Sequence, residues 1–210
     1  MTLPSIAEYI DRWSLSPLTA HLAEPPWVMT QHAEAYVSSM ITRLVGDYDV
    51  AGEIAIHRTA TVEAGAIVKS PVIVGPRCLI AATAYLRGGI YMDEDCIIGP
   101  GAELKSSFMF KGSKLAHFNF VGDSILGSAV NLEAGSVIAN YRNELSDRNI
   151  VITWGSRPIE TRIDKFGALV GDRVRVGANA VIAPGAILAK DQIIPRLSLF
   201  DQRPPSAPRT

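Results

Sequence analysis

Three basic side chains recur at a fixed interval in the central part of the chain. Eighteen residues separate Lys69 from Arg87, and eighteen separate Arg87 from Lys105. If this interval equals one turn of a repeating fold, the three cations lie above one another on one face, about 4.8 Å apart. Like charges at that spacing repel, and arginine beside lysine suits a bound phosphate. The spacing favours an anion site, with a solvated face of splayed side chains as the alternative.

A histidine follows this basic column at a short distance in the sequence. His117 lies in the segment KGSKLAHFNF, twelve residues after Lys105. An imidazole can take a proton near neutral pH, so His117 is a candidate general base beside a bound anion. A single histidine is also often an ordinary surface or packing residue, and its type alone does not separate the two interpretations.

The fold that must position these side chains is indicated by a six-residue repeat. The sixth residue of each block counted from Ala51 is aliphatic, Met or Phe: Ile56, Val62, Val68, Val74, Ile80, Leu86, Met92, Ile98, Leu104 and Phe110. Two places earlier the residue is small or apolar, from Ile54 and Ala60 through Cys78 and Cys96 to Phe108. This period is typical of short strands joined by tight turns, three per coil, and it predicts an all-β solenoid, a parallel β-helix.

The repeat divides the chain into three predicted parts. Residues 1–48 form an N-terminal helical cap, because Pro25 and Pro26 precede an apolar stripe with helical spacing. We expect the cap to cover the unpaired edge of the first coil. Residues 49–194 form the β-helix, and residues 195–210 form a flexible tail.

Two interruptions are predicted inside the β-helix. The register slips across KGSKLAHFNF, after which the next inward column is predicted to be Phe120, Leu126, Leu132 and Ile138. Residues 142–164 lack the repeat and are interpreted as an excursion with a hairpin, whose strands are IVITW and IETRI around GSRP. The repeat resumes at Val170 and continues to Ile194.

Composition excludes several classes of partner. The chain has 210 residues, 48% of them hydrophobic, and a formal net charge of −1, which gives no bulk attraction to nucleic acid or to a membrane surface. No apolar run approaches the length of a membrane span, and the N-terminal sequence does not read as a secretory signal, so we expect a cytoplasmic protein. Cys78 and Cys96 are eighteen residues apart and are predicted to stack as buried thiols; a metal or redox pair would lack nearby histidines.

The segment GSKLAHFNFVGDSILGSAVNLEAGSVIANY resembles the acetyltransferase domain of bacterial N-acetylglucosamine-1-phosphate uridyltransferase/glucosamine-1-phosphate acetyltransferase, within the hexapeptide-repeat acyltransferase family. The segment KFGALVGDRVRVGANAVIAPG is similar to archaeal-type sugar-phosphate nucleotidyltransferases that carry this domain. The resemblance covers residues 72–190. It implies a left-handed β-helix, an exception to the usual right-handed crossover, and a homotrimer with active sites between neighbouring subunits.

The resemblance also implies roles for individual residues. His117 matches the catalytic base, which takes a proton from the amine of an amino sugar as its nitrogen attacks the acetyl thioester. Arg87 and Lys105 match ligands of the acceptor phosphate. The remaining substrate contacts that it implies are Asn131, Asn140, Tyr141 and Lys165.

Two positions depart from the family pattern. Phe120 stands where the bacterial enzymes have a tyrosine, and Ala178 stands where they have a serine near the acetyl-CoA contact, so Ala178 is a candidate cofactor-binding position. The sequence therefore predicts an acetyl-CoA-dependent acyltransferase that acts on an amino-sugar phosphate such as glucosamine-1-phosphate, without a metal. Nucleotidyl transfer by this chain alone is not expected, because no P-loop or G-x-G-x-x-G pattern occurs.

Three other functions are conceivable for a chain with this repeat. A non-catalytic module could bind a sugar phosphate or nucleotide sugar and partner a separate nucleotidyltransferase. The end of the repeat soon after Ile194 favours this function, because the further coils that help to hold coenzyme A in the family are not expected. Zinc catalysis of the carbonic anhydrase type needs three histidines, and only His57 and His117 lie in the repeat region. A purely structural trimer leaves the basic column unexplained.

Overall fold

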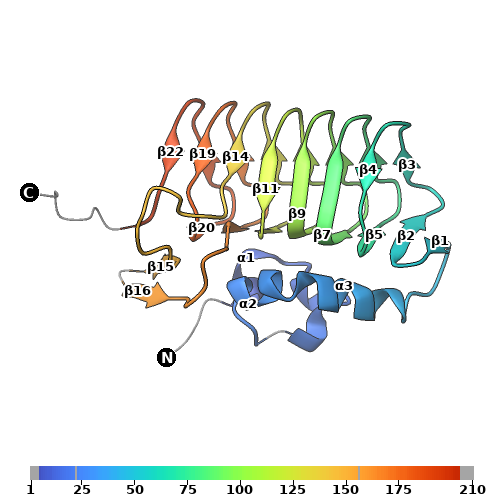
Figure 1. The fold of residues 1–210 in the computed structure, drawn as a ribbon, viewed down its shortest axis with the longest axis horizontal. Coiled ribbons are helices and arrows are strands. Elements are labelled where there is room, and N and C mark those ends of the chain that lie inside the picture. Colours follow the sequence, from blue (N-terminus) through green and yellow to red (C-terminus); the bar gives the residue numbers. More distant parts are fainter. Residues whose placement is uncertain (1–4, 22, 156, 204–210) are drawn as a thin grey trace, which may run out of the picture.

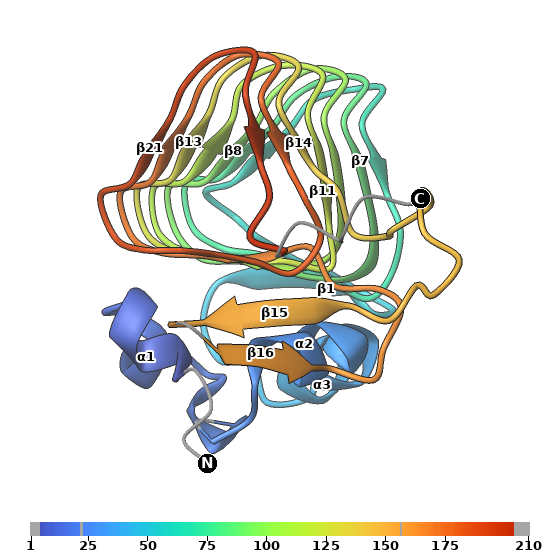
Figure 2. The same cartoon turned by 90° about the vertical axis from the view of Figure 1, so that its left-hand side faces the viewer.

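The structure is a computed structural model that describes residues 5–21, 23–155 and 157–203. It shows a parallel β-helix with helices and a hairpin along one side (Figure 1). With the carboxyl end toward the viewer, the chain passes from β13 over the upper turns to β14 and then along the base, clockwise as it advances (Figure 2). Clockwise advance toward the viewer is left-handed, so the predicted fold class is confirmed.

Each coil has three faces. The first face is a seven-stranded sheet made of β3 (Thr61–Val62), β6 (Leu79–Ile80), β8 (Ile97–Ile98), β10 (Lys114–Leu115), β13 (Asn131–Leu132), β18 (Arg175–Val176) and β21 (Ile193–Ile194). The second face contains β4 (Ile67–Val68), the first parts of β7 (Tyr85–Met92) and β9 (Glu103–Met109), and β11 (Phe120–Gly122), β14 (Val137–Ile138), β19 (Val181–Ile182) and β22 (Leu199–Phe200).

The third face, here called the base face, carries the helices. It contains β2 (Ile54–His57), β5 (Val72–Val74), the second parts of β7 and β9, β12 (Ile125–Leu126), β17 (Ala168–Val170) and β20 (Ala186–Leu188). Because β7 and β9 run without a break around the corner, the second and base faces belong to one 13-stranded sheet. Strand β1 (Tyr48–Ala51) pairs antiparallel with β2 and covers the free edge of β2 in the first coil.

The predicted inward columns fill the interior for most of the length. Ile80, Leu86, Met92, Ile98 and Leu104 are fully buried, as are Val170 and Leu188 after the excursion. Cys78 and Cys96 are buried free thiols in this core, as expected. The prediction was wrong for Phe108 and Phe110, which pack outside the coil in the cluster under the helices, while Met109 points inward.

The register change begins earlier than the sequence indicated. Between β7 and β9, Arg87 pairs with Lys105 but Ile90 pairs with Ser107, so Gly88 and Gly89 stand opposite Ser106 alone. The next two coils take seventeen residues each, since Ile98 pairs with Leu115 and Leu115 pairs with Leu132.

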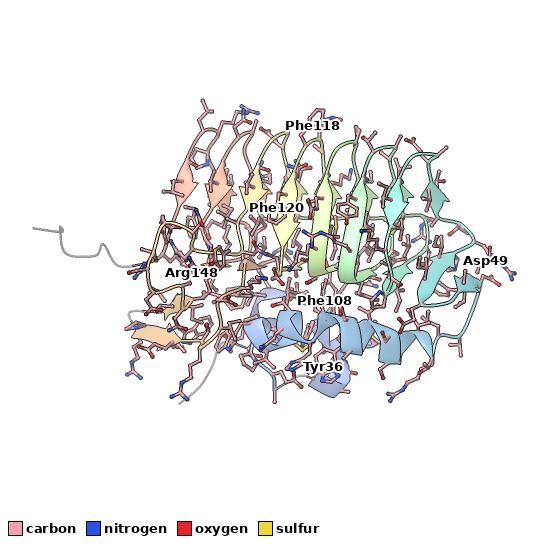
Figure 3. The ribbon with its side chains drawn as sticks, viewed as in Figure 1. Tyr36, Asp49, Phe108, Phe118, Phe120 and Arg148 are labelled. Atoms are coloured by element: carbon pink, nitrogen blue, oxygen red, sulfur yellow. The ribbon has the colours of Figure 1, made fainter. Side chains whose placement is uncertain are left out.

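The shortened coil also decides which side chain of β11 enters the core. Val121, paired with Leu104, is the inward residue of β11. The expected inward position of Phe120 is therefore corrected. Phe120 lies on the outer surface of the second face (Figure 3).

The N-terminal helical segment is present, but it lies along the base face and not over the first edge (Figures 1 and 2). It contains α1 (Ile6–Tyr9), α2 (Pro26–Gln31) and α3 (Ala33–Ile41), with single 3-10 turns at Trp13–Leu15 and Thr19–His21. Aromatic contacts join it to the β-helix, with ring centroids 5.8 Å apart for Trp13 and Phe110 and 6.4 Å apart for Trp27 and Phe166. Phe110 thus points out of the coil because it packs in a second hydrophobic core between the helices and the base face.

Two glycines allow the helices to approach this closely. Gly88 and Gly89 have φ values of +77° and +85°. A Cβ atom on Gly89 would lie 2.4 Å from the backbone nitrogen of Glu34 and 2.5 Å from the carbonyl carbon of Ala33. The start of α3 therefore sits directly on the corner of β7, where only glycine fits.

The excursion forms the predicted hairpin, and its root is tied to the last coil. Strands β15 (Val151–Trp154) and β16 (Arg157–Glu160) pair antiparallel beneath the base face (Figure 2). The side chain of Arg142 is 6% exposed; its two terminal nitrogens each bind Asp201 at 2.7 Å, and one also donates to the carbonyl of Pro184 at 2.8 Å. Parallel pairing reaches β22, so the coil includes residues placed in the tail from 195 onward. Residues 204–210 lie outside the described residues.

Replacing Gly89 by alanine tests the close approach. We expect Gly89→Ala to lower the free energy of unfolding in urea by at least about 2 kcal/mol, because it combines a left-handed backbone with a backbone clash. Gly112→Ala is the matched control, since Gly112 has φ +71° with nothing within 4 Å of the added Cβ, and we expect a loss of about 1 kcal/mol. Equal losses would show that the corner does not seat the helix.

The Arg142–Asp201 pair predicts an acid-dependent loss of stability. The hydrogen bond from Arg142 lowers the pKa of Asp201, so its carboxylate stabilises the fold above an unfolded-state pKa of about 3.9, and this contribution disappears as the pH falls through the lower folded-state pKa. Urea unfolding of wild type and Asp201→Asn over a pH series should give the largest difference near neutral pH and a vanishing one below about pH 2. A difference that does not change with pH contradicts this account.

Candidate functional site

The basic column predicted from the sequence lies on the second face. Arg87 pairs in register with Lys105, and the backbone N–H of Lys69 donates to the carbonyl of Leu86 in the next coil. The guanidinium of Arg87 binds Glu103 at 2.7 Å, and the Lys105 ammonium binds Asp123 at 2.8 Å. The carboxylates bound to Arg87 and Lys105 therefore offset the mutual repulsion of these cations.

Asp123 joins two predicted site residues. Its side chain is 7% exposed, and its carboxylate accepts hydrogen bonds from Lys105 Nζ at 2.8 and 3.0 Å and from the side-chain amide of Asn140. Gly122 makes room for this contact, because a Cβ there would lie 2.7 Å from Asn140 Nδ2. Sequence reasoning missed Asp123, although it follows Lys105 by eighteen residues, the interval of the basic column.

A polar pocket of about 520 Å³ adjoins this cluster. It lies between the start of α3, the corner of β7 and β9, and the chain that returns from the hairpin, and it is lined by Thr30, Gln31, His32, Glu34, Ala35, Gly88, Lys105, Ser106, Asp123, Ile163, Asp164 and Lys165. The fold thus brings Lys105 and Lys165 together although sixty residues separate them. The part of the pocket wall that comes from the helices could not be predicted from the sequence, because no local pattern indicates where the helices pack.

His117 lies elsewhere in the coil. It is exposed in the turn between β10 and β11, and its carbonyl accepts the N–H of Gly135 at 2.9 Å. Phe118, which follows it and is 73% exposed, marks this turn at the top of the molecule (Figure 3). Gly122, which pairs with Lys105, follows His117 by five residues, about 16 Å along an extended strand. The pocket lining includes Lys105 and not His117. One chain does not place His117 in the pocket.

Stacked turns join the first and second faces into an apical ridge, made of residues 117–118, 134–135 and 178–179. Ala178 lies on this ridge, and its N–H donates to the Glu133 carboxylate at 2.9 Å. That carboxylate also binds Arg196 at 2.8 Å, which holds its pKa below the usual range. Asn131 lines a small pocket of about 200 Å³ on the first face, beside Glu133.

Tyr141 stands apart from both pockets. Its ring lies under the guanidinium of Arg148, 5.3 Å from ring centroid to Cζ, on the segment that leads into the hairpin. The other predicted residues form three groups: Lys105, Lys165 and Asn140 at the base corner with Arg87 beside them, His117 and Ala178 on the apical ridge, and Asn131 on the first face.

Comparison with known proteins finds relatives whose names describe bifunctional enzymes. The chain is 32% identical over 123 residues to a "Bifunctional protein GlmU" of Methanococcus vannielii, and 33% identical over 136 residues to a "Bifunctional sugar-1-phosphate nucleotidylyltransferase/acetyltransferase" of Sulfurisphaera tokodaii. The resemblance stated from the sequence is confirmed. The matches cover 59% and 65% of this chain but only 29% and 33% of those relatives, so the chain spans about a third of their length.

Other comparisons add less. No family model matches the chain. Among solved structures it is similar to an Arabidopsis UDP-N-acetylglucosamine acyltransferase at 16% identity and a TM-score of 0.27, over 69% of this chain and 58% of that one. The acetyltransferase domain of PglB from Neisseria gonorrhoeae matches at 16% identity and a TM-score of 0.29, over 78% and 60% of the two chains.

Within residues 5–21, 23–155 and 157–203, no three His, Cys, Asp or Glu side chains gather as they would around a metal ion. No helix in the same ranges has both the length and the apolar character needed to cross a bilayer.

The Lys105–Asp123 contact predicts a measurable coupling. In a double-mutant cycle with Lys105→Met and Asp123→Asn, we expect the coupling free energy from urea unfolding to exceed about 1 kcal/mol, because both side chains are largely buried and removal of one leaves the other charge unpaired. The control cycle uses Arg77 and Asp95, an ion pair with side chains 53% and 38% exposed, for which we expect less than about 1 kcal/mol. Equal coupling in the two cycles would mean that Asp123 does not hold Lys105.

Proposed function

We propose that this chain is a cytoplasmic acyltransferase that transfers the acetyl group of acetyl-CoA to the amine of an amino-sugar phosphate such as glucosamine-1-phosphate. The observation that carries the proposal is the polar pocket that joins Lys105 and Lys165. These cations were expected to hold a phosphate, and the pocket volume suits a monosaccharide phosphate. Similarity to relatives whose names include acetyltransferase supports the choice of reaction.

In this proposal His117 accepts a proton from the amine as the nitrogen attacks the thioester carbonyl. The C–N bond forms, the C–S bond breaks, and the proton held by His117 passes to the departing coenzyme A thiolate, so that free thiol is released. Arg87, Lys105 and Lys165 bind the phosphate, while Asn131, Asn140 and Tyr141 orient the sugar or acyl group. Ala178, on the same ridge as His117, stands at the acetyl-CoA contact.

The separation of His117 from the cations requires a second copy. An amino sugar 1-phosphate carries its amine and its phosphate on neighbouring ring carbons, so base and cations must lie within the span of one ring. In one chain they occupy opposite ends of β11. A homotrimer in which the apical ridge of one copy faces the base corner of the next completes the site.

A non-catalytic sugar-phosphate or nucleotide-sugar module that assists a separate nucleotidyltransferase is the second candidate. The Ala178 contact favours it, because the N–H nearest the expected acetyl-CoA position is already taken by Glu133. Phe120 also removes one hydroxyl from the acceptor side of the second face. This module would bind the sugar phosphate at the same cations without using His117.

Removal of the base separates the two candidates. We expect His117→Ala to lower the rate of thiol release from acetyl-CoA with glucosamine-1-phosphate by about 10²–10⁴-fold, with sugar-phosphate binding by calorimetry retained. His57→Ala is the matched control, since the His57 side chain contacts Thr59 and Tyr48 in the first coil, and it should leave the rate unchanged. Wild-type protein that binds the sugar phosphate but releases no thiol supports the second candidate.

Mixing two inactive variants tests the shared site. Refolded together in equal amounts, His117→Ala and Arg87→Ala should recover up to about a quarter of wild-type activity, because a quarter of the interfaces then join an intact His117 to an intact Arg87. A mixture with no more activity than its components contradicts a site made by two copies.

A further inference from the structure

The pocket at the base corner has a wall that the repeat does not supply. Gln31, His32 and Glu34 come from the N-terminal helices, whereas Lys105, Asp123 and Lys165 come from the β-helix and the segment after the hairpin. The motifs that resemble sugar-phosphate enzymes lie within residues 72–190 and do not include these helical residues. A contact between these residues and a ligand would therefore depend on the helical segment and not on the repeat.

The helical wall is held rigidly in place. The start of α3 rests on Gly89, where an added Cβ would meet the backbone of Ala33 and Glu34 at 2.4–2.5 Å. His32 is fixed by a hydrogen bond between its Nδ1 and the carbonyl of Val28 at 3.0 Å. The backbone of the helical wall is thus positioned by its packing on the corner of β7.

The charges of the pocket divide into two sets. Lys105 and Asp123 bind each other and are largely buried. In the part of the chain that the structure describes, Glu34, Asp164 and Lys165 form no ion pair, and Glu34 and Gln31 are exposed. The β-helix and the segment after the hairpin thus offer Lys105 and Lys165 together with Asp164, and the helical side offers the carboxylate of Glu34 and the amide of Gln31.

We propose that Glu34 and Gln31 bind hydroxyl groups of the sugar ring and set the specificity for the acceptor sugar. The inference rests on the proposed function, because it places the phosphate at Lys105 and Lys165. Carboxylate and amide oxygens accept hydrogen bonds from sugar hydroxyls, and a site built for such bonds rejects a sugar whose hydroxyl points elsewhere. The helical segment thus acts as the specificity wall of the acceptor pocket.

The test compares binding of three small molecules by calorimetry: inorganic phosphate, glucosamine-1-phosphate and its 4-epimer galactosamine-1-phosphate. For Glu34→Ala, and for Gln31→Ala to a smaller degree, we expect the Kd of glucosamine-1-phosphate to rise about 10-fold and its ratio to the Kd of the epimer to move toward one. The Kd of inorganic phosphate should stay within about 2-fold, because its ligands are untouched. Glu8→Ala, an exposed acid of α1 away from the pocket, is the control and should change none of these values.

Two results overturn the inference in distinguishable ways. If wild type binds glucosamine-1-phosphate and releases thiol, but Glu34→Ala and Gln31→Ala keep its Kd and its selectivity, the helical wall plays no part while the proposed function stands. If wild type does not bind glucosamine-1-phosphate at all, the proposed function fails together with the inference.

Discussion

The close contact between the corner of β7 and the start of α3 is the constraint on which the rest of the structure depends. Two glycines with positive φ stand opposite a single serine in the next coil, and the coils between this corner and the excursion take seventeen residues. The coils after the excursion take eighteen again, since Val176 pairs with Ile194. The same glycines admit the helix backbone to the β-helix surface. One corner thus sets the register of β11 and forms the floor of the polar pocket.

Charge pairing at this corner explains how a column of like charges persists in a folded protein. Arginine and lysine heads spaced by one coil repel each other, and Glu103 and Asp123 supply the opposite charges from neighbouring positions. Lys165 then adds a cation that has no such partner among the described residues, from a segment far along the chain. In the proposed function, a phosphate would join an ionic network that already orients Lys105.

The second hydrophobic core, between the N-terminal segment and the base face, determines which surfaces of the β-helix are covered. Phe108 and Phe110 turn away from the interior because the base face is covered by Trp13 and other apolar side chains of the N-terminal segment. The hairpin covers the same face farther along, and Arg142 ties it to the last coil. The base face is consequently buried over most of its length, while the first and second faces and the apical ridge stay open to ligands or to another copy of the chain.

The sequence alone determined the coil, the stacked cations and the buried cysteines, because a six-residue apolar period is a local property that one repeating geometry satisfies. It could not determine that Val121 and not Phe120 enters the core, since one residue omitted at Ser106 reverses which side chains point inward. The pocket wall of Gln31 and Glu34, the role of Asp123 and the distance of His117 from the cations were decided only by the tertiary structure. Each depends on packing between segments far apart in the chain, and such contacts leave no periodic trace in the sequence.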